Sequence, residues 1–209
     1  MEARLALDTI ARRLSQMENV SGEGAMTLVD ANGDSVRLDA AFALAPPERA
    51  RVRGWKFGQA VLDLTILPDS VWLYSPRKGC AESAAGNTSR ALRQWLGLLA
   101  GRIDGPGASI ETTSTQIIVT RAIKDGQSLV CYIDRRTLTP RRYVVTDHGT
   151  GARFSLVLDR YKTLGDTVWP SRVQARDESR RVTFEMRHVE MNVAPPSAFR
   201  PPARAERLP

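Results

Sequence analysis

Apolar and polar residues recur with two different periods along this chain. In residues 2–17, Leu5, Leu7, Ile10, Leu14 and Met17 recur at helical spacing, which predicts an amphipathic helix. From Met26 onward the period changes to two, as in strands with one buried face. The pattern therefore predicts one helix followed by a mainly β chain.

Turn signals divide residues 20–75 into a first series of strands. These signals are Asn32-Gly33, Pro46-Pro47, Gly58-Gln59 and Pro68-Asp69. Asn-Gly favours a two-residue hairpin because both positions tolerate positive φ, and proline ends a strand. We expect five antiparallel strands here, the last being the short aromatic segment SVWLYS at residues 70–75.

A polar segment and a second helix interrupt the strands. Residues 76–87 are small and loop-like, and residues 88–101 carry Leu92, Trp95, Leu96 and Leu99 as a helical apolar stripe. Strands are expected again near residues 108–113, 116–123, 128–134, 139–146, 152–161, 167–177 and 180–191. A Pro/Arg-rich tail follows at 195–209, expected to be extended on the surface or partly disordered, with Phe199 as its one large apolar residue.

The fold class predicted from these elements is mainly β with two helices. About eleven to twelve antiparallel strands would curl into an incomplete barrel rather than stay flat. An inserted helix without a sheet edge to join has to bury its apolar stripe against the concave face or cover an opening to it. We expect a single domain over 1–209, because 209 residues is an ordinary domain length.

Composition narrows the partners. The chain has a net charge of +7 and no apolar run long enough to span a bilayer. Arg49, Arg51 and Arg53 would share one strand face. The favoured interpretation is an outer face in contact with solvent, followed by a face that binds an anionic membrane surface and then by one that binds nucleic acid. Because no nucleic-acid-binding motif accompanies them, a nucleic-acid partner is not expected.

Few residues are candidates for metal binding or catalysis. Cys80, Cys131, His148 and His188 are too widely spaced for a Cys/His zinc site, so neither a metal nor another cofactor is expected. Cys80 and Cys131 fit either two buried thiols or, in an oxidising compartment, a disulfide. Ser35 with Asp147 and His148 permits a serine esterase only as a distant alternative, because Ser35 begins a hairpin strand and not a strand-to-helix elbow.

Three segments resemble the LolA/LolB-like lipoprotein carrier superfamily. PDSVWLYSPRKG at 68–79 is similar to an aromatic family strand, APPERARVRGWKFG at 45–58 to a proline turn and basic strand, and HVEMNVAPPSAFRPPARA at 188–205 to the family's closing segment. Ala45 departs from the carrier pattern, which has an arginine there that holds a lid. The membrane-targeting apolar loop of the receptor is not evident either.

The resemblance implies a half-barrel that holds acyl chains in its concave cavity without enzymatic chemistry. It implies a monomeric carrier of lipid or lipoprotein that helps deliver acyl chains to the outer membrane, or alternatively a sensor or scaffold that binds another envelope protein. A periplasmic location is expected, with or without a lipoprotein anchor in the outer membrane. The charged start MEARLALDTIARRLSQ is not a signal peptide, so that signal would be absent from this sequence.

Apolar residues of the strands and of the second helix are the candidates for lining this cavity. They are Val52, Phe57, Leu62, Leu64, Ile66, Trp72, Trp95, Leu96 and Leu99. An acyl chain requires a dry apolar trough more than polar contacts, since each buried methylene contributes about 0.8 kcal/mol. The same nine residues also fit an ordinary hydrophobic core, and the sequence leaves both interpretations open.

Overall fold

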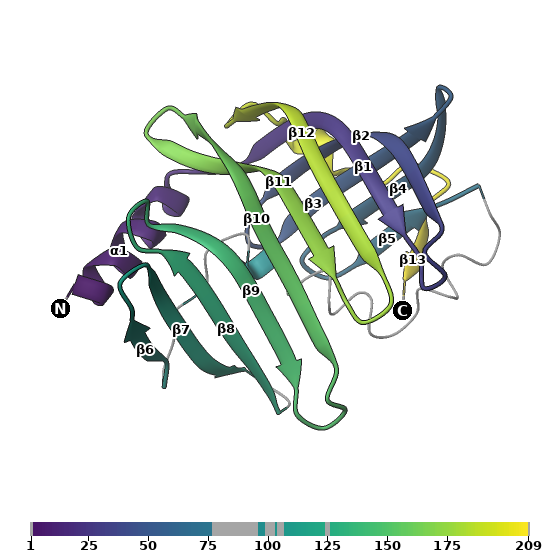
Figure 1. Ribbon diagram of the computed structural model, residues 1–209. Helices are drawn as coiled ribbons and strands as arrows, with labels where there is room; N and C mark the ends of the chain where they lie inside the picture. The colour runs from purple at the N-terminus through teal and green to yellow at the C-terminus, as the bar shows by residue number, and fades with distance from the viewer. Residues whose placement is uncertain (1, 77–95, 99–102, 104–106, 124–125, 209) are drawn as a thin grey trace. The chain divides into compact units, whose positions relative to one another are not determined.

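The computed structural model describes residues 2–76, 96–98, 103, 107–123 and 126–208. Its strands form one 13-stranded sheet in the order β13-β5-β4-β3-β2-β1-β12-β11-β10-β9-β8-β7-β6 (Figure 1). The sheet is open, with β13 and β6 at the two ends of the order. The predicted mainly β, antiparallel and incompletely closed architecture is confirmed.

The elements agree closely with the sequence pattern. They are α1 Glu2–Ser15, β1 Val20–Val29, β2 Ser35–Ala45, β3 Arg49–Lys56, β4 Gln59–Ile66, β5 Val71–Tyr74, β6 Ser109–Thr112, β7 Gln116–Ile123, β8 Gln127–Asp134, β9 Thr139–Asp147, β10 Arg153–Leu164, β11 Thr167–Arg176, β12 Arg181–Met191, the 3-10 helix η1 Pro196–Phe199 and β13 Glu206–Leu208. Of the second predicted helix, residues 96–98 are helical, and the rest lies outside the described residues.

The chain divides into two compact units. Unit 1 consists of Met1–Gln16, Thr27–Val36 and Gly101–Phe184. Unit 2 consists of Met17–Met26, Arg37–Ala100 and Glu185–Pro209. Strands β1, β2 and β12 each contribute residues to both units.

In unit 1, α1 packs beside the sheet strands β6 to β11. Ala6, Leu7 and Ile10 are buried, whereas Leu5 is 61% exposed, so Leu5 is not part of the buried apolar stripe that the sequence predicts. The helix end is held by two hydrogen bonds: Arg13 Nη1 donates to Thr137 O at 3.3 Å, and Thr167 Oγ1 donates to Arg13 O at 3.3 Å.

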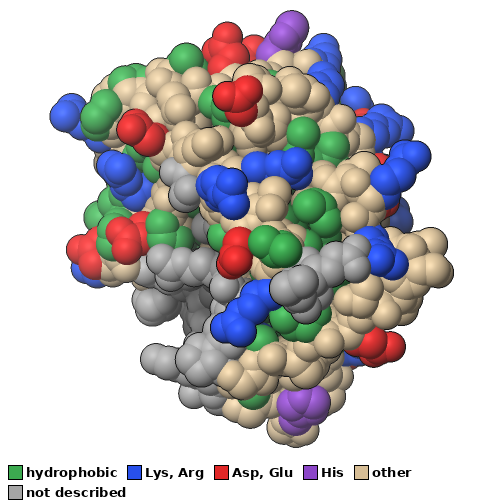
Figure 2. Space-filling view, turned by 90° about the vertical axis from the view of Figure 1, so that its left-hand side faces the viewer, with side chains coloured by type: hydrophobic (Ala, Val, Ile, Leu, Met, Phe, Trp, Pro, Cys, Tyr) green, Lys and Arg blue, Asp and Glu red, His purple; other side chains and the backbone are tan. Residues whose placement is uncertain are grey.

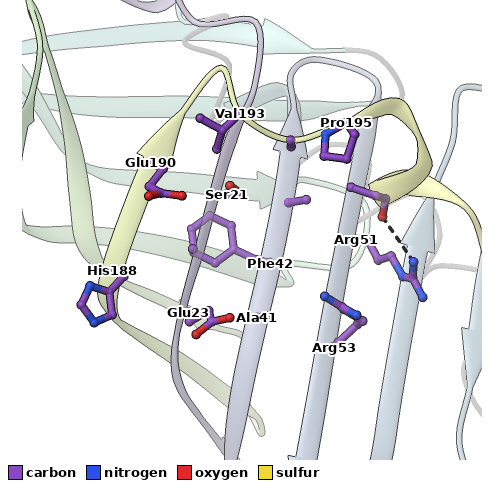
Figure 3. A pocket seen from close by; sticks show the side chains of 14 residues that line it. Ser21, Glu23, Ala41, Phe42, Arg51, Arg53, His188, Glu190, Val193 and Pro195 are labelled. Carbon is purple, nitrogen blue, oxygen red and sulfur yellow. Dashed lines mark hydrogen bonds between the residues drawn. The ribbon is translucent and has the colours of Figure 1, made fainter.

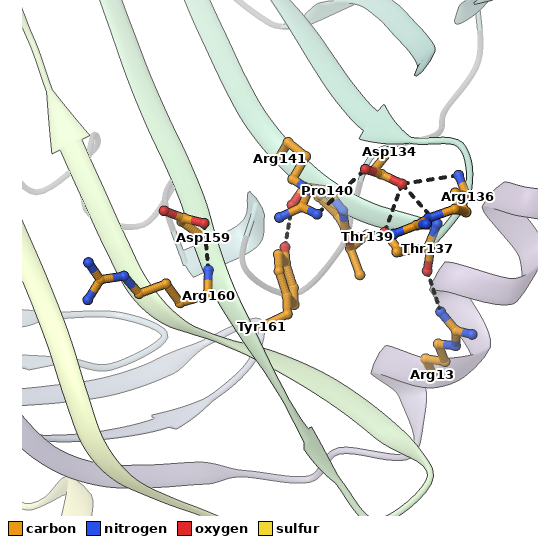
Figure 4. Close-up of polar contacts among 10 residues, drawn as sticks. All are labelled: Arg13, Asp134, Arg136, Thr137, Thr139, Pro140, Arg141, Asp159, Arg160 and Tyr161. Atoms are coloured by element: carbon orange, nitrogen blue, oxygen red, sulfur yellow. Dashed lines mark hydrogen bonds and ion pairs between the residues drawn. The ribbon is translucent and has the colours of Figure 1, made fainter. Parts of the chain in front are cut away.

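The β8–β9 turn that receives α1 is organised by one carboxylate (Figure 4). Asp134 Oδ1 accepts hydrogen bonds from the backbone N–H of Arg136 at 3.1 Å and of Thr137 at 2.9 Å. The hydrogen bond from Thr137 N has the largest effect on the pKa of Asp134. Together with the bond from Arg136 N and the nearby Arg141 guanidinium, it holds that pKa below its usual value. The turn is therefore stable at neutral pH, where the carboxylate is ionised.

A tightly packed set of side chains forms the core of unit 1. Cys131 lies directly across from Tyr143 in the β8–β9 register, and both are almost fully buried. Tyr161 donates its hydroxyl hydrogen bond to Pro140 O (Figure 4). Burial raises the pKa of all three groups, so they are neutral core groups.

In unit 2, the segment after β12 returns to the sheet instead of lying loosely on its surface. Asn19 and Asn192 hold its start reciprocally: Asn192 Oδ1 accepts from the backbone N–H of Glu18 and Asn19, and Asn19 Oδ1 accepts from Ala194 N at 2.9 Å. Phe199 is buried, and β13 then pairs with β5. The predicted tail is thus an ordered part of unit 2.

Two glycines allow β1 to approach β12 closely within unit 2. A Cβ at Gly22 would overlap the carbonyl oxygen of His188, and a Cβ at Gly24 would overlap that of Glu185. Glycine is required at both positions because any side chain would collide with backbone atoms, which cannot rotate away as a side chain can.

Candidate functional site

The strand register of unit 2 places a row of large apolar residues on one side of β2, β3, β4 and β5. Val52 lies opposite both Phe42 and Leu64, and Leu64 lies opposite Leu73. Residues directly opposite in antiparallel strands project to the same side. We call this side the apolar face; it comprises Phe42, Val52, Leu62, Leu64, Ile66 and Leu73.

Burial along the apolar face is uneven. Phe42 and Ile66 are buried, whereas Val52, Leu62 and Leu64 are only partly buried. A strand side that packs fully into a core excludes water from all its apolar residues. In the part of the chain that the structure describes, these three side chains therefore keep surface that a ligand can cover.

The structure brings together only part of the predicted lining set. Val52, Leu62, Leu64 and Ile66 share the apolar face. Leu96 is buried in the short described stretch of helix, and Trp95 and Leu99 lie outside the described residues.

Two of the predicted residues lie elsewhere. Trp72 is paired with Thr65 and projects to the opposite side, where its Nε1 donates to Ser70 Oγ at 3.1 Å. Phe57 is 93% exposed at the tip of the β3–β4 hairpin.

The hairpin tip has an unusual backbone for its residue. Phe57 has φ 53° and Gly58 has φ 76°, the combination of a two-residue turn that normally carries Asn-Gly or Asp-Gly. A bulky side chain at positive φ is a genuine outlier, and such outliers cluster at functional sites. The neighbouring Lys56 ammonium lies 5.6 Å from the Phe57 ring centroid, so the tip combines an exposed aromatic ring with a positive charge.

The opposite side of β2, β3 and β4 carries the arginines. Arg51 is paired with Ala43 and Arg53 with Ala41, which confirms that the predicted arginines share one strand face. We call this side the arginine face. The C-terminal segment packs on it: the Arg49 guanidinium lies 5.3 Å from the Phe199 ring centroid, and Phe199 is buried against Ala43.

A pocket of about 550 Å³ opens on the arginine face beside this segment (Figure 3). Its base is formed by small residues, among them Gly22, Ala41 and Ala43, and Glu23 and Arg53 contribute its charged sides. A second hollow of about 400 Å³ shares Glu23, Ala41 and His188 with it. This polar pocket was not anticipated, because its residues come from four strand segments far apart in sequence.

The residues considered for a serine esterase do not form a triad. The Asp147 carboxylate accepts hydrogen bonds from Thr150 N, Gln127 Nε2 and Gly149 N. These bonds, that from Thr150 N having the largest effect, keep the pKa of Asp147 below its usual value. His148 Nε2 contacts Ser128 Oγ at 3.0 Å and not Ser35. Asp147 is thus a turn residue and does not orient the histidine.

The described residues contain neither a metal-ligand cluster nor a membrane-spanning helix. No cluster of three or more His, Cys, Asp or Glu side chains among them has an arrangement that fits a metal ion. None of their helices combines the length and apolarity needed to cross a bilayer. Cys131 is a buried free thiol, and Cys80 lies outside the described residues.

Basic residues do not gather into one patch on the face seen in Figure 2. Lys and Arg side chains lie among Asp, Glu and apolar side chains there. On this face the basic groups are therefore interspersed with acidic ones.

Comparisons with solved structures show a LolA-like fold. A LolA superfamily protein from Nitrosomonas europaea has a TM-score of 0.60 at 9% identity, covering 95% of this chain and 97% of that one. A DUF1329 family protein from Desulfovibrio piger has a TM-score of 0.64 at 13% identity, covering 94% and 96%. A putative outer membrane lipoprotein-sorting protein domain from Vibrio parahaemolyticus has a TM-score of 0.60 at 12% identity, covering 94% and 97%. No family profile matches the sequence, and no curated protein is recognisably similar to it.

Proposed function

We propose that the protein is a non-enzymatic carrier that binds the acyl chains of a lipid or lipoprotein against its apolar face. The observation that supports this most directly is the partial burial of Val52, Leu62 and Leu64 within one continuous apolar row. Covering such surface with an acyl chain contributes about 0.8 kcal/mol per methylene removed from water. The binding requires no polar partner and no catalytic group.

The cellular role follows from the fold by analogy. One structural neighbour is a putative outer membrane lipoprotein-sorting domain, and a LolA-like fold suits a monomer that works in the periplasm. Delivery of acyl chains to the outer membrane is the step that we assign to the protein. A lipoprotein anchor in that membrane is compatible with the same role.

Delivery requires contact with a membrane, and we assign that contact to Phe57. Its ring is exposed at a hairpin tip, and Lys56 adds a positive charge beside it. Burying a phenylalanine side chain contributes about 1.5–3 kcal/mol, and a basic residue near an anionic surface adds about 1 kcal/mol. This apolar tip is a feature that the sequence pattern alone did not make evident.

Two measurements test acyl binding. Native mass spectrometry of protein purified from a bacterial host should reveal a co-purifying lipid or lipopeptide. In a titration with a fluorescent long-chain fatty acid, Leu64→Gln should weaken binding about tenfold, because it removes apolar contact surface. Leu5→Gln, at an exposed position of α1, should leave binding unchanged.

The opposite results would overturn the carrier proposal. A clean apo mass together with no fatty-acid binding by the wild-type protein would favour a scaffold that binds an envelope protein. Equal fatty-acid affinity of the wild type and Leu64→Gln would show that the apolar face is not the binding surface. Thermal unfolding of each variant separates lost binding from lost folding.

A further inference from the structure

The arginine face of unit 2 carries a pocket that acyl binding does not use. Its 550 Å³ lie on the side of β2 and β3 opposite the apolar face. This volume is within the range of small-molecule sites, about 300–1,000 Å³. Gly22, Ala41 and Ala43 leave the base of the pocket without large side chains, so a ligand can reach the charged groups around it.

Some of the charged groups around the pocket already have partners. Arg51 pairs with Asp63 at 2.7 Å, and in the adjoining hollow Arg187 pairs with Asp39 at 3.6 Å. Three charged groups remain: Arg53, whose guanidinium lies 5.2 Å from the Trp55 ring centroid, and the carboxylates of Glu23 and Glu190. Among the described residues these three make no ion pair.

The three groups stand on opposite sides of the pocket. Figure 3 shows Glu190 on β12 and Glu23 on the neighbouring β1, whereas Arg53 lies on β3, on the other side of β2. In the strand order β3-β2-β1-β12, two strand spacings separate the strand of Arg53 from that of Glu23. At about 4.8 Å per spacing, their backbones lie roughly 10 Å apart. The pocket is therefore acidic on one side and basic on the other.

This arrangement selects against simple ions. A plain anion attracted by Arg53 meets the repulsion of two carboxylates, and a plain cation attracted by Glu23 and Glu190 meets that of Arg53. A molecule with separated charges satisfies both sides. A primary ammonium supplies three N–H donors for the carboxylates, and a phosphate accepts from the planar guanidinium.

We propose that this pocket binds a zwitterion with a primary ammonium and a phosphate group, as in phosphoethanolamine. Glu23 and Glu190 hold the ammonium, and Arg53 holds the phosphate. The ligand is either a free phosphoethanolamine-type molecule or the headgroup of a phosphatidylethanolamine membrane. The site lies on the face opposite the acyl site, so its existence does not depend on the proposed carrier function.

Calorimetric titration with phosphoethanolamine tests the site. Ethanolamine alone and inorganic phosphate alone should each bind more weakly than the zwitterion. Glu190→Gln, Glu23→Gln and Arg53→Gln should each weaken phosphoethanolamine binding about tenfold, because each removes a charge-assisted contact. Glu48→Gln, an exposed glutamate outside the pocket, is the matched control and should bind as the wild type does.

Vesicle sedimentation distinguishes the two ligand sources. If the headgroup is the ligand, wild-type protein should sediment with phosphatidylethanolamine vesicles more than with phosphatidylcholine vesicles, and Glu190→Gln should lose that difference. If the free molecule is the ligand, calorimetry alone is positive. Absence of binding in both assays, or binding that the three pocket variants leave unchanged, would overturn the proposal. Circular dichroism of the variants confirms that they are folded.

Discussion

Arg51 and Asp63 form a two-bond ion pair across β3 and β4. Arg51 Nε donates to Asp63 Oδ1 at 2.9 Å and Nη2 donates to Oδ2 at 2.7 Å. The third donor, Nη1, reaches Ala198 O at 3.3 Å. The pair therefore fixes the C-terminal segment as well as the two strands, and it shields one arginine of the arginine face from solvent.

Asp63→Asn should destabilise the protein by about 3 kcal/mol. The side chains of the pair are only 16% and 9% exposed, so the substitution leaves a mostly buried guanidinium without its carboxylate. Asp39→Asn is the matched control, because its pair with Arg187 is 71% and 77% exposed and should contribute about 0.5 kcal/mol or less. Urea denaturation measures the free energy of unfolding of both variants. Equal losses would show that the buried Arg51–Asp63 pair stabilises the protein no more than the exposed pair does.

Gly22→Ala and Gly24→Ala should each destabilise unit 2 strongly, by about 3 kcal/mol or more. The added Cβ would overlap backbone oxygens of β12, so the strands would have to move apart and lose packing. Gly97→Ala is the control: no atom lies within 4 Å of its Cβ position, and alanine is favoured over glycine in a helix. Thermal unfolding that showed no difference between the three variants would disprove the close approach.

Phe57→Asn should change stability and membrane binding in opposite directions. Asparagine tolerates positive φ better than phenylalanine, so the free energy of unfolding should rise by about 0.5–1 kcal/mol. Sedimentation with anionic vesicles should weaken about tenfold, because the exposed ring is lost. Leu5→Asn removes another exposed apolar side chain and should leave vesicle binding unchanged; equal losses would refute a role for the tip.

Cys131 should make stability fall at alkaline pH. Burial raises the thiol pKa, and the hydrogen bond with Tyr143 offsets only part of this effect. The unfolded thiol ionises near pH 8.5 while the folded one keeps its proton. The contribution of the buried Cys131 thiol to the free energy of unfolding is therefore complete below about pH 8.5 and is lost as the pH rises above that value.

Denaturation between pH 7 and 10 checks this sign. In a Cys80→Ser background, the additional substitution Cys131→Ala should flatten the decline above about pH 8.5. Native Cys131 should also resist alkylation over this range, since the thiolate is the reactive form. Rapid alkylation of the folded protein at pH 8 would contradict the burial of this thiol.

Most of the architecture could be predicted because the strand signals are local. Apolar alternation and turn residues predicted β7 at its observed bounds, Gln116–Ile123. They predicted the bounds of most other strands to within a few residues. The strand β13 could not be found in this way. Its partner β5 lies more than 130 residues earlier, and three residues carry too little pattern of their own.

The candidate lining residues show what strand periodicity can and cannot predict. Val52, Leu62, Leu64 and Ile66 could be assigned to one face because period two is unbroken where residues 50–54 pair with residues 62–66. Trp72 alternates with Val71 and Leu73 along β5 and therefore projects to the other side of the sheet. Phe57 lies at the tip because the turn centres on Phe57-Gly58 and not on Gly58-Gln59, one residue earlier than the sequence suggests.

The pairing of β13 with β5 also has a consequence for synthesis on the ribosome. β5 emerges with one hydrogen-bonding edge open, and its partner Glu206–Leu208 is made only after more than 130 further residues. Throughout that interval the edge can join a strand of another chain. Truncation before β13 makes this state permanent, so a shortened protein should aggregate during expression even though the residues of the apolar face are all present.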